Sequence, residues 1–121
     1  MARVIAFVPD LLFGSSVVSS LQAAGHEPVL ASDRDALARE LPGAAALVVD
    51  LTFEAPQRIA LVRELRPAEL KTLAFYSHVE GEVRDRARDA GFDLVIPRSR
   101  MAREGAVLVD RLLAGHANPA P

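Results

Sequence analysis

Short apolar runs alternate with longer segments of helical spacing along this chain of 121 residues. The apolar runs lie at residues 4–8, 28–31, 45–49, 72–76 and 94–96. Continuous hydrophobicity, as opposed to strict alternation with polar residues, is typical of strands that helices cover on both faces. The runs therefore predict five parallel strands, and Pro28 confines the second of them to a strand start or an edge.

The segments between the runs carry the signals that begin and end helices. They predict helices over residues 12–24, 33–41, 56–66, 80–90 and 100–114. Ser32 is the expected N-cap of the second helix, while Gly25 and Gly91 end the first and fourth. Strands that alternate with helices predict one doubly wound, flavodoxin-like α/β domain over residues 1–115, with sheet order 2-1-3-4-5 and helices on both faces. Residues 116–121 are expected to form a disordered tail.

Composition narrows the functional classes. A formal net charge of −2 argues against nucleic acid as a partner, because such domains are usually strongly basic. The absence of cysteine excludes disulfides, thiolate catalysis and cysteine-ligated metals. No apolar stretch approaches the roughly 20 residues that span a bilayer, and Pro9 interrupts the first apolar run before it could serve as a signal peptide. We therefore expect a cytoplasmic protein without a membrane segment.

Polar residues follow four of the five predicted strands. In an open doubly wound sheet, ligands and chemistry collect at the carboxyl ends of the strands. The residues at those ends are Asp10, Asp50, Ser77, His78, Arg98 and Ser99. The predicted topology brings them to one pocket, in which two carboxylates, a hydroxyl and a guanidinium meet.

The residues at these strand ends resemble those of the response-regulator receiver domain family, the CheY-like domains of bacterial two-component and phosphorelay signal transduction. The run Leu-Val-Val-Asp-Leu at residues 47–51 is similar to the third strand of that family, and Ala-Gly-Phe-Asp at 90–93 is similar to its turn into the fifth. The resemblance implies that Asp50 is a candidate phosphoacceptor for a histidine kinase. It also implies that Asp10, Asp50 and the backbone carbonyl of Thr52 hold Mg²⁺, and that Ser77 and Arg98 contact the phosphoryl group.

Two departures from the family pattern concern the chemistry of this site. Pro9 stands where the family has a second acidic residue, and Arg98 stands near the position of the family's lysine in a chain whose only lysine is Lys71. An arginine fork does not replace a compact ammonium at a tight oxyanion site. We therefore expect a degenerate, or pseudo-receiver, member that binds Mg²⁺ weakly and is labelled little by small phosphodonors.

Each candidate residue also has an alternative interpretation. Asp50 is either a carboxylate nucleophile or a polar residue that caps a neighbouring loop. Asp10 beside Asp50 requires either a metal or a basic partner, and Arg98 is the candidate for the second role. The helix start at residues 13–16 and the strand-end pocket also suggest a sensor of small molecules or anions, with Ser15, Ser77, His78, Arg98 and Ser99 as its residues.

The leading functional expectation is a stand-alone signalling module that works through protein contacts. Arg100 and Arg103, at the start of the fifth predicted helix, are the candidate interaction surface, and the expected partner is a histidine kinase or a downstream target. An enzyme is not expected, because the chain has neither a Gly-x-Ser-x-Gly turn nor histidines at zinc-ligand spacing. The sequence leaves the oligomeric state open.

Overall fold

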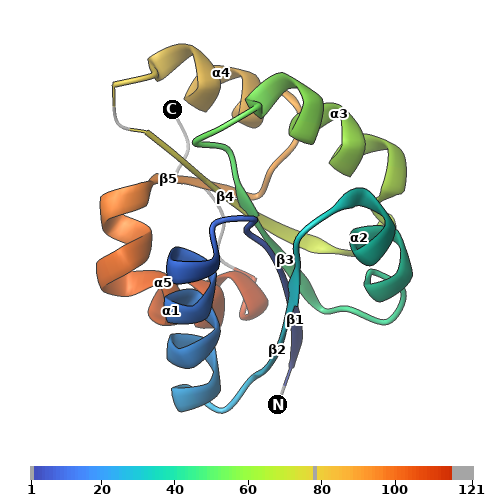
Figure 1. The fold of residues 1–121 in the computed structure, drawn as a ribbon, viewed down its shortest axis with the longest axis vertical. Helices are drawn as coiled ribbons and strands as arrows, with labels where there is room; N and C mark the ends of the chain where they lie inside the picture. Colours follow the sequence, from blue (N-terminus) through green and yellow to red (C-terminus); the bar gives the residue numbers. More distant parts are fainter. Residues whose placement is uncertain (1, 78, 116–121) are drawn as a thin grey trace.

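The computed structural model describes residues 2–77 and 79–115, which form an α/β sandwich of three layers (Figure 1). The strands are β1 (Arg3–Phe7), β2 (Glu27–Ala31), β3 (Ala46–Asp50), β4 (Lys71–Tyr76) and β5 (Leu94–Pro97). The helices are α1 (Leu11–Ala23), α2 (Arg34–Glu40), α3 (Ala55–Leu65), α4 (Gly81–Asp89) and α5 (Arg98–Leu113). All strand pairs are parallel and the order is β2-β1-β3-β4-β5, which confirms the predicted topology.

Helices cover both faces of the sheet, and this explains why the strands are continuously apolar. Alternate residues of a strand point to opposite faces. Ile5 and Phe7 of β1 pack in the cluster that includes residues of α2, α3 and α4. Val4 and Ala6 pack in the opposite cluster, with residues of α1 and α5. Strands that are buried on both faces have no polar face. Pro28 lies on the edge strand β2, as expected.

Two differences from the predicted helix starts change the local structure, whereas the other three helices begin within one residue of the prediction. Asp33, not Ser32, is the N-cap of α2, and its carboxylate accepts the Ala36 N–H at 2.8 Å. Helix α5 begins at Arg98, two residues before the predicted start, directly after the extended Pro97. Its first three residues are polar, so hydrophobic spacing marks the helix only from Met101 onward. Arg98 and Ser99 therefore belong to the first turn of a helix and not to a loop.

The turn into β5 holds the far edge of the sheet in register. The carboxylate of Asp93 accepts the backbone N–H of Thr72 at 2.8 Å, and it also accepts the Thr72 hydroxyl. Gly91 before it has a φ of +91°, a conformation that favours glycine. Asp93 thus ties the start of β5 to the start of β4. The opposite ends of β1, β3, β4 and β5 are left to form the candidate site.

Candidate functional site

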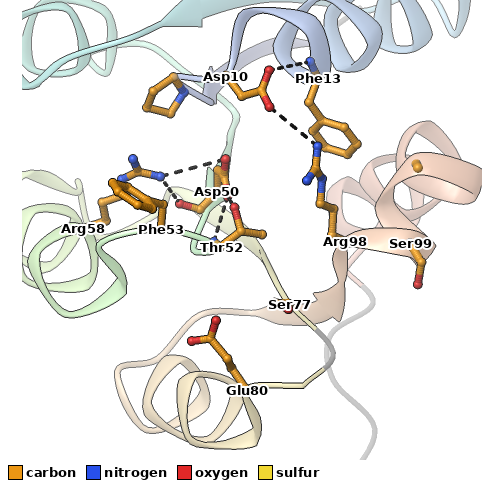
Figure 2. Close-up of a pocket in the computed structure, with 12 residues that line it drawn as sticks. Asp10, Phe13, Asp50, Thr52, Phe53, Arg58, Ser77, Glu80, Arg98 and Ser99 are labelled. Carbon is orange, nitrogen blue, oxygen red and sulfur yellow. Dashed lines mark hydrogen bonds and ion pairs between the residues drawn. The ribbon is translucent and has the colours of Figure 1, made fainter.

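A pocket of about 870 Å³ lies at the carboxyl ends of the central strands (Figure 2). It is lined by Pro9, Asp10, Phe13, Asp50, Thr52, Phe53, Arg58, Ser77, Glu80, Arg98, Ser99 and Ala102. Six of the residues expected at this site are therefore brought together, from the ends of β1, β3 and β4 and the start of α5. The topology rule for open α/β sheets located the pocket correctly.

Asp50 is the last residue of β3 and is only 5% exposed. Its Oδ1 accepts the backbone N–H of Thr52 at 2.8 Å and also the Thr52 hydroxyl. These two bonds close a tight turn that fixes the carboxylate against the strand end. Thr52 thus contacts Asp50 through its amide and its side chain, and the metal-ligand role expected for its carbonyl stays a prediction.

Arg58, on the first turns of α3, is a site residue that the sequence analysis missed. Its guanidinium donates to the backbone carbonyl of Asp50 at 2.7 Å and lies 3.9 Å from Asp50 Oδ2. It also lies 5.8 Å from the centre of the Phe7 ring, at the end of β1. The residue is 8% exposed. A buried positive charge therefore stands beside the buried carboxylate, as the dashed lines of Figure 2 show.

The spacing of α3 contained a signal for Arg58. Ala55, Ile59 and Val62 are buried, and Arg58 falls on the same helical face, three residues after Ala55 and four before Val62. An arginine on the apolar face of a helix needs a buried partner. The strand-end carboxylate eight residues earlier is that partner.

Asp10 and Arg98 form a second, more exposed pair on the other side of the pocket. Asp10 Oδ1 accepts the backbone N–H groups of Leu12 and Phe13 and so caps α1, while Oδ2 lies 3.7 Å from Arg98. The Arg98 guanidinium also lies 4.4 Å from the centre of the Phe13 ring. The side chains of Asp10 and Arg98 are 50% and 47% exposed, so their attraction is screened by solvent.

The remaining expected site residues have different outcomes. Ser15 is an exposed residue within α1 and does not line the pocket. The anion site expected at residues 13–16 stays a prediction, although the Leu12, Phe13 and Gly14 amides at the start of α1 bond to the carboxylate or carbonyl of Asp10. Ser99 lines the pocket, but its hydroxyl points away from Asp50 in Figure 2. His78 and the expected tail 116–121 fall outside the described residues.

The donor groups do not fit the Mg²⁺ that the family resemblance implies. Mg²⁺ requires carboxylate or carbonyl oxygens in near-octahedral geometry. Asp10 Oδ1 accepts two backbone amides, Asp10 Oδ2 lies 3.7 Å from the positive charge of Arg98, and Asp50 Oδ2 faces Arg58. Pro9 offers no carboxylate. Within residues 2–77 and 79–115, no three His, Cys, Asp or Glu side chains are grouped to hold a metal ion.

Comparisons with known proteins identify the fold. No model of a known protein family matches the sequence, and no curated protein matches it. Solved structures do match: a response regulator from Thermotoga maritima has a TM-score of 0.81 at 16% identity, covering 95% of this chain and 99% of that one. The chain has the receiver fold. A receiver protein from Burkholderia phymatum gives 0.79 at 18% identity, with 99% and 100% covered.

A third similar structure is the BeF3-activated receiver domain of DrrB, with a TM-score of 0.81, 14% identity, and 94% and 98% of the two chains covered. These identities are too low to carry function from one chain to another, so the shared property is the receiver fold.

Among the described helices, none combines the length and the apolar character needed to cross a membrane.

Proposed function

We propose that this protein is a cytoplasmic signalling module of the receiver type that acts by binding other proteins. One observation carries the proposal: on a receiver fold, the solvent-accessible side chains of Arg100, Arg103 and Val107 share one face of α5. The partner is a histidine kinase or a downstream target in a two-component system.

The proposed binding surface runs along α5. Arg100, Arg103 and Val107 have the spacing i, i+3 and i+7, which places them on one face of the helix. Val107 is an exposed large apolar residue, and both arginines reach the same acid, Glu104, at 3.3 Å and 3.8 Å. One carboxylate shared by two guanidinium groups leaves net positive charge on this face. A partner surface with acidic residues around an apolar contact fits it.

In this proposal Asp50 is a permanently placed negative charge, and its phosphorylation is at most a minor activity. A carboxylate nucleophile needs a free oxygen and a cation that offsets charge on the phosphoryl group. Thr52 occupies Oδ1, and Arg58 stands beside Oδ2. Partner binding is therefore proposed to be independent of phosphorylation.

Charge reversal on α5 tests this function. We expect Arg100→Glu with Arg103→Glu to weaken partner binding by at least about tenfold, because it removes a complementary charge patch. Asp50→Asn should change it less than about twofold. The measurement is the quantity of partner captured by the immobilised protein from an extract of the source organism, followed by the dissociation constant for that partner once purified.

The matched control carries Arg39→Glu and Arg63→Glu, which reverse two exposed arginines on α2 and α3. It should bind the partner as the unchanged protein does. Loss of capture by an Asp50→Asn protein that circular dichroism shows to be folded, or equal loss in the control, would contradict the proposal.

An anion sensor is the second candidate, and the position of Arg98 favours it. The Arg98 guanidinium is half-exposed, lies against the Phe13 ring and lines the pocket. The acidic neighbour that pairs with it is Asp10, whose Oδ2 lies 3.7 Å away. In this role Asp50→Asn should strengthen the binding of inorganic phosphate, because it removes a like charge from the pocket. Phosphate binding that is unchanged in Asp50→Asn and in Arg98→Met would exclude the sensor.

A further inference from the structure

Asp50 and Arg58 are the two charged residues in the core of the described chain. Removing a charge from water costs several kcal/mol, and the cost is offset only when a partner of opposite sign lies close and hydrogen bonds satisfy the remaining polar atoms. Each member of this pair therefore depends on the other. The pair joins β3 to α3 beside the end of β1, where Phe7 lies against the guanidinium.

The loop between β3 and α3 is shaped so that Arg58 reaches Asp50. Glu54, which precedes α3, has φ 52° and ψ 41°, a left-handed conformation that costs a residue with a side chain about 1 kcal/mol. It makes no side-chain capping bond to the helix, and its carboxylate instead lies 4.0 Å from the Arg58 guanidinium. Arg58 thus receives a second acidic neighbour from the turn that positions it.

We infer that Arg58 is the built-in counter-ion of Asp50 and supplies the positive charge that a metal ion would otherwise bring to the end of β3. Its guanidinium lies 3.9 Å from Asp50 Oδ2, the carboxylate oxygen that Thr52 does not occupy. A divalent cation at that oxygen would meet a permanent positive charge that cannot be deprotonated. The charge of Asp50 is therefore balanced without a metal.

This inference shares with the proposed function the position of Arg58 beside Asp50 Oδ2, but its test reads Mg²⁺ affinity and not partner binding at α5, so each can fail without the other. It differs from the expectation drawn from the sequence, in which Pro9 and Arg98 weaken Mg²⁺ binding. Arg98 is half-exposed and pairs with Asp10, whereas Arg58 is buried and stands at Asp50 itself. Removing the charge of Arg58 alone should change the affinity of the site for a cation.

The test is a calorimetric titration of four proteins with MgCl₂: the unchanged chain, Arg58→Met, Arg58→Lys and Arg63→Met. Arg58→Met should bind Mg²⁺ at least about tenfold more tightly than the unchanged chain, because the buried carboxylate then lacks its cation. Arg58→Lys keeps a positive charge, and Arg63→Met removes an exposed arginine from the same helix. Both should behave as the unchanged chain. Adding Asp50→Asn to Arg58→Met should abolish the gain.

A folded Arg58→Met protein with no gain in Mg²⁺ affinity would overturn the inference. Saturable binding of Mg²⁺ to the unchanged chain at concentrations below about 1 mM would also overturn the inference, because a carboxylate site without a built-in counter-ion binds Mg²⁺ in that range. If Arg58→Met does not fold, urea denaturation of the unchanged chain provides the test. The inference predicts the same urea midpoint with EDTA and with an excess of Mg²⁺, because a protein that binds no Mg²⁺ is not stabilised by it. A higher midpoint with Mg²⁺ would contradict the inference.

Discussion

Replacing Arg58 by methionine is expected to lower the free energy of unfolding by about 3 to 5 kcal/mol, the range seen when one partner of a buried ion pair is removed. Methionine fills a similar volume, so the loss comes from the charge and its hydrogen bond. Asp50 then keeps a carboxylate that is 5% exposed and has lost its nearest cation, and its backbone carbonyl has lost a donor at 2.7 Å. Urea denaturation followed by circular dichroism measures the change.

A double-mutant cycle separates this effect from a packing defect. Asp50→Asn alone should also destabilise the fold, because it leaves the buried guanidinium of Arg58 without its partner. The two changes together should cost less than the sum of the single changes, since neither charge is then left alone. Arg63→Met should stay within about 0.5 kcal/mol of the unchanged chain. Purely additive costs would show that the two residues do not act as a pair.

Replacing Phe75 by alanine should lower the free energy of unfolding by a similar amount, about 3 to 5 kcal/mol, because it opens a large cavity in the core. Phe75 lies on β4, an interior strand of the sheet, and is fully buried. Its ring is 5.1 Å from that of Phe13, and Phe13 in turn lies under the Arg98 guanidinium. The cavity should therefore also loosen Arg98 and its pair with Asp10.

Phe53→Ala is the matched control, because Phe53 is also a phenylalanine but lines the strand-end pocket and is 68% exposed. It should change stability by no more than about 0.5 kcal/mol, as expected for a surface position. Comparison of the two urea midpoints gives the result directly. A loss for Phe75→Ala that is no larger than about 0.5 kcal/mol, the limit expected for Phe53→Ala, would contradict this prediction.

The sequence was informative wherever a pattern repeats. Strands buried on both faces must be continuously apolar, so residues such as Val48 and Val49 revealed the strands and their parallel arrangement. The order of the sheet then placed Asp10 and Asp50 at one edge. The basic partner considered for Asp10 is also present, since Arg98 lies 3.7 Å from its carboxylate.

Features that depend on a single side chain were less visible. The spacing of α3 places Arg58 on its apolar face, but only the three-dimensional packing shows that Asp50 is its partner. The polar first turn of α5 carries no hydrophobic spacing, so Arg98 was expected in a loop. Ser15 was proposed for an anion site because a helix start offers free amides. Asp10 bonds to those amides, which only the cap geometry could show.

The central claim is that arginine side chains, and not a metal ion, balance the carboxylates at the strand ends of this receiver fold. The most direct test adds Mg²⁺ and beryllium fluoride, the group in the activated DrrB structure, to the unchanged protein and follows the backbone amides by NMR. The Thr52 amide, bonded to Asp50 Oδ1, is the reporter. The account predicts that its resonance keeps its position throughout the titration. A saturable shift of the Thr52 amide that disappears in Asp50→Asn would contradict it.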